Sequence, residues 1–361
     1  DDMLTIDQSV VETTSLVVLF DGGLGADTLT GPDAGAEFAL TAEGAGSLGN
    51  VDFRSVESLV GGSGEDTLSG PTADTTWNIT DEDAGNVAGV AFSGMENLSG
   101  AADNEDTFVV TADGSLSGIM DRGHGGFDTL VQEGGSFDSV TFVATGPTSG
   151  TITRDGSVLT YDGLEPLISD NMDAADLVID LSMFSDIATV SQSGSSITIN
   201  SGADDGSGIT FESPTFAVPT ASLTINLGDD LGQLPFNAPT DIPQIAGDAI
   251  EIQALSLGDI DFIIDGQDGL DSVSFTGSVT TTGEITVNAE QISVASGVTV
   301  SGGSVDFQAI ATADSDLLKL AANVGVYVAL PKADIAVQGG VAATAGNVTL
   351  NASASSALDA S

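Results

Sequence analysis

The sequence contains no cysteine, so neither disulfide bonds nor thiolate metal sites contribute to the fold. A single histidine leaves no set of imidazole ligands for a zinc site. Lysine and arginine together number 5 against 54 aspartate and glutamate residues, which gives a formal net charge of -49. Because this charge repels phosphate backbones and anionic membrane surfaces, nucleic-acid binding is excluded as a function.

Long apolar segments are also lacking. No stretch approaches the roughly 20 apolar residues of a membrane-spanning helix, so we expect no direct membrane insertion. Hydrophobic residues nevertheless make up 41% of the chain, which is too many for a disordered acidic tail. Neither end of the sequence shows a capping element, and we expect the chain to be a piece of a longer protein.

Glycine and aspartate form the most informative motif. Residues 61–69 read GGSGEDTLS and fit the pattern G-G-x-G-x-D-x-U-x, where U is a large apolar residue. The glycines permit a tight turn whose carbonyl groups face a cation, and Asp66 adds a carboxylate oxygen. The apolar residue that follows, Leu68, is expected to point into a core of strands. Further copies or degraded copies occupy residues 22–29, 100–108, 123–130 and 266–273.

The first motifs belong to an internal repeat. Asp27 and Asp66 are 39 residues apart, and Asp66 and Asp106 are 40 apart. A period near 40 is compatible with a propeller blade or with two solenoid coils of roughly 20 residues each. Because Asp106 and Asp128 are only 22 residues apart, the third copy is shortened by about one coil. A stack tolerates this shortening and a closed ring does not, so the solenoid is favoured.

Short strands dominate the rest of the chain. Asp155-Gly156 lies between two alternating segments and predicts a β-hairpin that decorates or interrupts the stack. Beyond residue 166 the sequence consists of short alternating strands bounded by Gly, Asn, Asp or Ser, with no helix-period runs between them. The prediction is an all-β, right-handed parallel β-solenoid, with one region over residues 1–165 and a second over 166–361.

The glycine-aspartate motifs resemble the calcium-binding repeats of the repeats-in-toxin (RTX) proteins. The segments at 161–166, 222–228 and 283–289 resemble the sequences of giant repetitive bacterial surface or matrix proteins with filamentous-haemagglutinin-like coils. This resemblance implies an exported, extracellular or cell-surface β-solenoid, stabilised by calcium, that acts as a stalk, adhesive or matrix element. Its expected partners are other copies of itself or cell-surface glycans.

Calcium is the expected cofactor, since it prefers the oxygen ligands that these turns offer. Asp106 and Asp128, about one coil apart, are the pair expected to share an ion, with Asp103 assisting. Three carboxylates at 3-residue spacing in a second turn are expected to converge on another cation. The candidate metal ligands are Asp21, Asp27, Asp66, Asp103, Asp106, Asp128, Asp265, Asp268 and Asp271.

Two alternatives remain open. Each turn could instead be a plain solenoid corner, in which glycine supplies the backbone geometry and aspartate caps backbone amides. Glu57 and Glu96 recur at matching positions of the repeat and are interpreted as a solvated face. The second alternative is a polysaccharide lyase, epimerase or glycosidase on a β-helix, although the scattered basic residues and the negative charge disfavour a polyanionic substrate. No catalytic residues are assigned, and we expect no enzymatic activity.

Overall fold

The computed structural model describes residues 1–11, 17–202, 210–228, 247–313 and 333–356. Almost all regular structure in these residues is β-strand, which confirms the all-β class. Within the described residues the one helix is the single turn α1 (Gln8–Val11). None of the described residues forms a helix long and apolar enough to cross a membrane.

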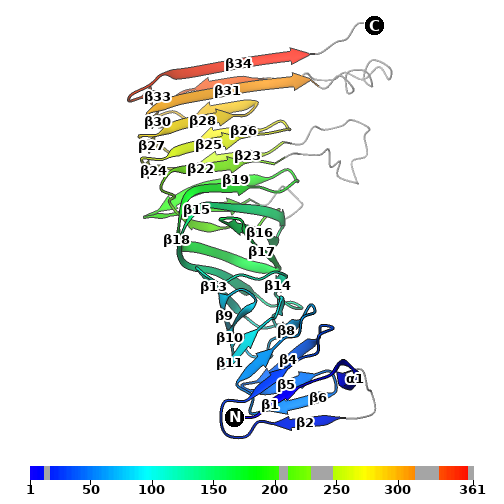
Figure 1. The fold of residues 1–361 in the computed structure, drawn as a ribbon. Coiled ribbons are helices and arrows are strands. Elements are labelled where there is room, and N and C mark those ends of the chain that lie inside the picture. Colours follow the sequence, from blue (N-terminus) through cyan, green and yellow to red (C-terminus); the bar gives the residue numbers. More distant parts are fainter. Residues whose placement is uncertain (12–16, 203–209, 229–246, 314–332, 357–361) are drawn as a thin grey trace, which may run out of the picture. The chain divides into compact units, whose positions relative to one another are not determined.

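The chain divides into two compact units (Figure 1). The first comprises Asp1–Phe137, Pro147–Asp173 and Glu212–Phe216, and the second comprises Asp138–Gly146, Ala174–Phe211 and Ala217–Ser361. Two long strands contribute to both units, β15 (Asp128–Gly146) and β18 (Leu164–Asp180).

The other strands of the first unit are short, and most have three to six residues. They are β1 (Met3–Thr5), β2 (Val18–Asp21), β3 (Thr28–Thr30), β4 (Glu37–Ala42), β5 (Ala45–Leu48), β6 (Val51–Arg54), β7 (Ser58–Val60), β8 (Thr67–Ser69), β9 (Thr76–Asp81), β10 (Ala84–Val87), β11 (Val90–Ser93), β12 (Asn97–Ser99), β13 (Thr107–Thr111), β14 (Ile119–Asp121), β16 (Ser149–Arg154), β17 (Ser157–Asp162) and, across its boundary, β21 (Thr215–Ala217).

Parallel ladders give the first unit its core. In the ladder β4, β8, β12, β14 and β17 each strand pairs in parallel with the next. A second parallel ladder joins β9, β13 and β15, where the rings of Trp77 and Phe108 stack with centroids 5.3 Å apart. Side chains at alternate positions point inward, and the inward row of the first ladder is fully buried: Phe38, Leu68, Leu98, Met120 and Tyr161.

The expectation of purely parallel sheets with a single hairpin is wrong. Antiparallel pairs also occur between β4, β5 and β6, between β9, β10 and β11, and between β19 and β20. The sharp reversals are possible because the turn residues take positive φ, at Gly44 (64°) and Gly49 (58°) in the first repeat and at Asp83 (51°) in the second. Each 40-residue repeat therefore contains a group of antiparallel strands, which the alternating sequence pattern did not predict.

The coil length also differs from the expected 20 residues in this region. The backbone N–H of Asp27 donates a hydrogen bond to Glu57, 30 residues further on. The N–H of Asp66 donates to Glu96, which is also 30 residues further on. Farther along, Asp106 contacts Asp128 after 22 residues. Because the sequence repeat of about 40 residues is longer than this 30-residue return, Asp27, Asp66 and Asp106 precede strands of three different ladders, β3, β8 and β13, and do not lie in one row.

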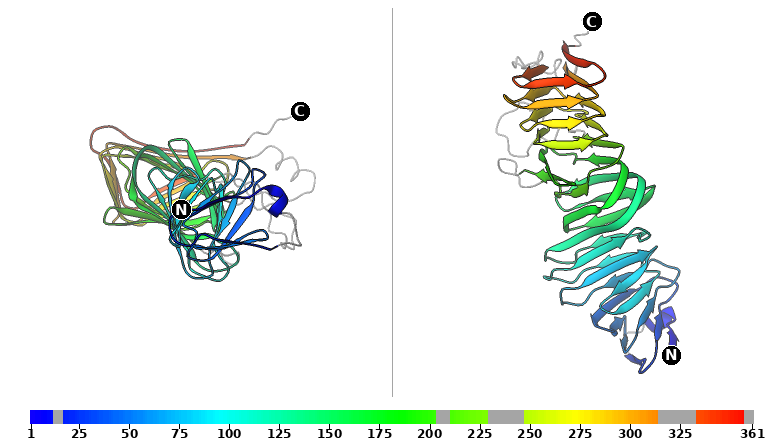
Figure 2. Two further views of the ribbon diagram at one scale, coloured as in Figure 1. Left: turned by 60° about the horizontal axis from the view of Figure 1, so that its bottom comes forward. Right: turned by 90° about the vertical axis from the view of Figure 1, so that its left-hand side faces the viewer.

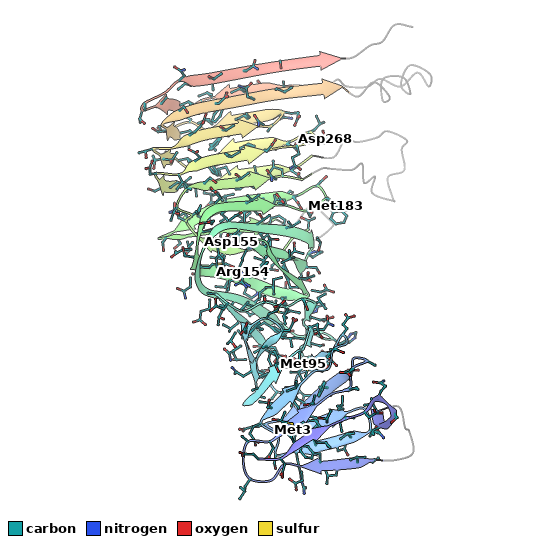
Figure 3. The ribbon with its side chains drawn as sticks, in the orientation of Figure 1. Met3, Met95, Arg154, Asp155, Met183 and Asp268 are labelled. Atoms are coloured by element: carbon teal, nitrogen blue, oxygen red, sulfur yellow. The ribbon has the colours of Figure 1, made fainter. Side chains whose placement is uncertain are left out.

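The predicted hairpin is confirmed. β16 and β17 pair antiparallel in full register, and the turn residues Asp155 and Gly156 have φ values of 47° and 89°. The buried guanidinium of Arg154, labelled with Asp155 in Figure 3, donates hydrogen bonds to the backbone carbonyls of Thr111 (3.0 Å) and Gly114. The hairpin is thereby anchored to the first unit.

The second unit is built from β19 (Ile187–Ser193), β20 (Ser196–Ser201), β22 (Ser222–Asn226), β23 (Ala249–Ile252), β24 (Leu255–Gly258), β25 (Asp261–Asp265), β26 (Ser272–Phe275), β27 (Val279–Thr281), β28 (Glu284–Asn288), β29 (Gln291–Val294), β30 (Thr299–Gly302), β31 (Ser304–Ala313), β32 (Asp334–Val337), β33 (Gly340–Ala343) and β34 (Val348–Ser356). Here the order of strands is regular, as the yellow to red part of Figure 2 shows.

Three parallel ladders run side by side through the second unit. They are β18–β22–β25–β28–β31–β34, β19–β23–β26–β29–β32 and β24–β27–β30–β33. Between the first two ladders Phe275 and Phe307 stack with ring centroids 5.6 Å apart. Aliphatic side chains such as Ile225, Ile264 and Val287 fill the same inward row and are fully buried. Burial of these apolar rows stabilises the stack.

Candidate functional site

In the turns that end at Asp66, Asp106 and Asp271 the aspartate folds back onto the first glycine of its own turn. A side chain on Gly61 would meet Oδ2 of Asp66 at 2.8 Å, which is too close for any Cβ atom. The same clash exists between Gly100 and Asp106 (2.9 Å) and between Gly266 and Asp271 (2.7 Å). The added Cβ would lie still closer to a backbone carbonyl oxygen, that of Gly94 (1.8 Å) at Gly61 and that of Arg122 (2.5 Å) at Gly100. Glycine at these positions is therefore required by the close backbone approach as well as by the carboxylate.

Asp66 shows most fully what the carboxylate does. Its Oδ2 accepts a hydrogen bond from the backbone N–H of Gly62 in its own turn, at 2.7 Å. Its Oδ1 accepts one from the backbone N–H of Ala36, the residue before the neighbouring strand β4, also at 2.7 Å. We call an acidic side chain that precedes one strand and accepts the backbone N–H of the residue preceding the neighbouring strand a carboxylate cap. Such a cap satisfies buried amides at a corner where no strand pairing reaches them.

The cap recurs through both units. The backbone N–H of Asp66 donates in turn to Oε2 of Glu96 at 2.7 Å. Asp66 therefore caps one backbone amide with its side chain, while its own amide is capped by Glu96. The pairs of donor and capping residue are Asp2–Asp27, Asp27–Glu57, Ala36–Asp66, Asp66–Glu96, Thr75–Asp106, Asp106–Asp128, Asp186–Asp248, Asp248–Asp271 and Asp271–Glu290.

Asp106 and Asp128, the pair expected to share an ion, do meet. The backbone N–H of Asp106 donates to Oδ1 of Asp128 at 2.5 Å. Both oxygens of Asp106 are already occupied, Oδ1 by Thr75 N–H (2.9 Å) and Asn104 Nδ2 (2.8 Å) and Oδ2 by Ala101 N–H (3.3 Å). In contrast, Oδ2 of Asp128 is buried without a hydrogen-bond partner among the described residues.

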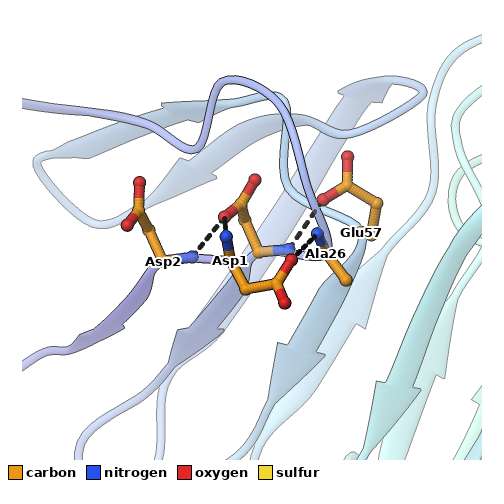
Figure 4. A network of polar contacts seen from close by, with 5 residues as sticks. Asp1, Asp2, Ala26 and Glu57 are labelled. Atoms are coloured by element: carbon orange, nitrogen blue, oxygen red, sulfur yellow. Dashed lines mark hydrogen bonds and ion pairs between the residues drawn. The ribbon is translucent and has the colours of Figure 1, made fainter.

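Asp27 lies in a similar environment near the amino terminus (Figure 4). It is fully buried, and its Oδ1 accepts the backbone N–H of Asp2. Its own N–H donates to Glu57 Oε2 at 2.8 Å, while Asp1 Oδ1 accepts the N–H of Ala26 at 2.8 Å. As with Asp128, Oδ2 of Asp27 is buried without a hydrogen-bond partner in the described part of the chain.

The remaining predicted ligands have different surroundings. Asp21 forms an ion pair with Arg54 at 2.7 Å, which holds the pKa of Asp21 below its usual value. Asp103 is exposed, with φ of 59°. In the second unit Asp265 is half-buried and accepts Gln267 N–H at 3.3 Å, Asp268 is exposed at the turn labelled in Figure 3, and Asp271 is fully buried as a cap.

Burial controls the protonation of the caps. It raises the pKa of Asp66 and Asp106 above the usual value, against hydrogen bonds that lower it. Burial likewise raises the pKa of Asp128 to about 6, and the negative charge of Asp106 adds to this effect. Desolvation penalises the ionised carboxylate, and a single accepted N–H only partly offsets that cost.

Several caps were missed or misread from the sequence. Glu57 and Glu96 were interpreted as a solvated face. Glu57 is exposed and Glu96 is half-buried, but each also accepts a backbone N–H, which was not expected. Asp248 and Glu290 were not singled out. A common signal was present, because nearly every cap is an acid that stands two positions before a buried strand residue, as in Glu57-Ser58-Leu59.

The described residues contain no group of three or more His, Cys, Asp or Glu side chains arranged to hold a metal ion. Buried oxygens without a hydrogen-bond partner in this part of the chain include Oδ2 of Asp27, Oδ2 of Asp128 and Oδ1 of Asn104. A cation at Asp27 or Asp128 would need further oxygen ligands from the chain. Asp66 and Asp106 offer no such free oxygen, so their donor sets fit a cap better than a calcium site.

Comparisons with protein-family models, with curated proteins and with solved structures found no match.

Proposed function

We propose that this chain is a structural segment of a large exported bacterial protein, a parallel β-solenoid that serves as a stiff support for surface adhesion or for matrix and filament assembly. The observation that carries the proposal is the six-stranded ladder from β18 to β34, whose strands pair in parallel with matched register. Such a ladder adds length by repetition, which is what a spacer requires.

The polar chemistry of the chain supports the same proposal. The acidic side chains of the caps form hydrogen bonds that join neighbouring strands. In a buried cap such as Asp66 both carboxylate oxygens accept backbone N–H groups, so neither oxygen is left to bind a substrate. The buried guanidinium of Arg154 is likewise committed to backbone carbonyls, so it does not face a polyanionic sugar. The enzymatic alternative therefore gains no support from these groups.

Calcium enters the proposal as a stabiliser of the folded state. A net charge of -49 makes the compact chain repel itself, and any cation that binds the folded state alone stabilises it by mass action. Oδ2 of Asp27 and Asp128 and the exposed carboxylates of Asp103 and Asp268 are the proposed contacts. The proposed location is extracellular or at the cell surface, where calcium is plentiful.

Small-angle X-ray scattering tests the structural role. The chain is measured in EDTA and in calcium, and we expect a cross-sectional scattering signature of a rigid elongated particle in calcium. A compact, isometric particle in both buffers would contradict a spacer function. Size-exclusion chromatography with light scattering on the same samples reports whether copies associate, and an activity screen on neutral and acidic glycans tests the enzymatic alternative.

A further inference from the structure

The three ladders of the second unit end together, with β34, β32 and β33 as their final strands (Figure 1). β34 has nine residues, and all of them pair in parallel with β31, from Val305–Val348 to Ala313–Ser356. Among the described residues no strand pairs with the other edge of β34. The backbone N–H and C=O groups along that edge can therefore pair with a further strand.

The side chains of β34 continue apolar rows that are buried in the strand before it. Val348 and Leu350 are 41% and 46% exposed, whereas their register partners on β31, Val305 and Phe307, are 1% and 0% exposed. The core of the stack thus reaches the surface along this strand. Covering these side chains with another strand would remove apolar surface from water, which is favourable.

This end of the stack also lacks the features that usually protect an exposed edge. Residues 335–356 contain no charged side chain and no proline, although 16% of the residues in the whole chain are charged. Natural edge strands are commonly blocked by charges, by proline or by bulges. Because each chain carries a net charge of -49, an uncharged edge is also where another copy meets the least local repulsion.

We propose that β34 pairs with β34 of a second copy of this chain, antiparallel about a two-fold axis at Ala352. In this register all nine residues of the strand pair, and Leu350 lies opposite Ala354 of the second copy. A two-fold axis across an edge strand reverses the direction of its partner, and closed two-fold dimers are the commonest assemblies. Self-pairing covers the exposed apolar side chains of both copies at once.

The pairing supplies a partner for the proposed assembly role, and it rests on that role for its biological purpose. Its physical basis is the free edge alone. Sedimentation velocity and light scattering on the full chain, over a wide range of concentration, therefore test it directly. We expect a species of twice the chain mass of 35.9 kDa at high concentration. Its fraction should rise with salt, because salt screens the repulsion between acidic chains.

A charge on the edge should prevent the pairing. Leu350→Asp removes a leucine from each side of the interface and places two carboxylates there, so we expect association to weaken at least about tenfold. Val158→Asp is the matched control, because Val158 is similarly exposed (50%) but lies on the hairpin of the first unit. The control should keep the mass of the wild-type protein, and circular dichroism verifies that both variants fold.

A single cysteine reports the register, since the natural sequence contains none. Residues directly opposite each other in an antiparallel pair have Cα atoms about 4.5–5.5 Å apart, a separation that a disulfide spans. Under mild oxidation by a glutathione buffer we expect Ala352→Cys to form a disulfide-linked dimer. Val158→Cys should remain without a cross-link under the same conditions.

A wild-type chain that stays monomeric at every concentration would overturn the proposal. That result would not affect the support role, which depends on the rigid elongated shape measured by scattering. A dimer that persists in Leu350→Asp, or that Ala352→Cys fails to cross-link, would also overturn the proposal, because the copies would then meet through another surface.

Discussion

The backbone N–H of Asp66 donates a 2.7 Å hydrogen bond to Oε2 of Glu96, 30 residues further along the chain. Asp66 in turn caps Ala36 with its own side chain. Three successive passes of the chain are thus joined through one residue. The same relationship between an acid and the acid of the next pass recurs in the second unit at Asp248 and Asp271.

Removal of the Asp66 side chain tests how much a cap contributes. Asp66→Ala leaves the N–H groups of Ala36 and Gly62 without their acceptor, and we expect the free energy of unfolding to fall by about 2–4 kcal/mol. Urea denaturation followed by circular dichroism measures this change. Asp33→Ala, at an exposed position of the adjacent turn, is the matched control and should stay within about 0.5 kcal/mol of wild type. Equal losses in both variants would argue against the cap.

Two variants of Glu96 distinguish the contribution of its acceptor oxygen from that of its charge. Glu96→Gln keeps an oxygen that accepts the N–H of Asp66, so its cost should be below about 0.5 kcal/mol. Glu96→Ala removes the acceptor and should cost about 1–2 kcal/mol. The same denaturation experiment compares them. If Glu96 were merely part of a solvated face, the two variants would have the same stability.

The two glycines that open the first motif should differ in their tolerance of alanine. A Cβ on Gly22 would lie 2.1 Å from the carbonyl oxygen of Ser55 and 2.7 Å from Cβ of Asp27, so we expect Gly22→Ala to cost roughly 2–4 kcal/mol. Gly23 has open space around it and only a φ of 82° to maintain, so Gly23→Ala should cost about 1 kcal/mol. Thermal melting ranks the pair, and the opposite order would contradict the packing described.

Stability should decrease as the pH rises through the acidic range. The folded protein binds protons more tightly than the unfolded chain at Asp66, Asp106 and Asp128, whose pKa values are all raised. The stabilisation is therefore complete below the ordinary aspartate value and is lost as the pH approaches about 6 at Asp128.

Melting temperatures across this range measure the effect, in high salt so that surface repulsion is screened. Asp128→Asn should flatten part of the slope, whereas Asp113→Asn, at an exposed position, should not. A melting temperature that rises between about pH 4 and pH 6 would contradict the assignment.

Local patterns predicted much of the fold. Alternating apolar residues indicated the strands, and Asp155-Gly156 indicated a hairpin. Trp77 occupies the position of Phe38 in the neighbouring repeat, and both rings are fully buried. The 39- and 40-residue spacings were real, but they did not reveal that the chain returns to its neighbour after 30 residues. The number of residues in one coil depends on which strands pair in the folded chain. The similarity between the sequence repeats does not specify that pairing.

The acidic residues were located correctly and only partly understood. The motif around Asp66 predicted a tight turn whose carboxylate binds a cation, with capping of backbone amides as the alternative; two N–H groups meet the carboxylate there. The capping role of Glu57 and Glu96 was missed because a glutamate before a strand has the same local sequence whether or not it accepts the amide of a neighbouring strand. That distinction requires the register between strands far apart in the chain.

The central claim is that buried carboxylates hold neighbouring passes of this chain together by capping backbone amides. Far-UV circular dichroism with thermal melting, first in EDTA and then through titrations of calcium and magnesium, tests it most directly. We expect a β spectrum and a cooperative melt already in EDTA, with calcium raising the melting temperature more than magnesium does. A chain that shows no β signal until calcium is added would contradict the claim, because the buried carboxylates would then act as metal ligands.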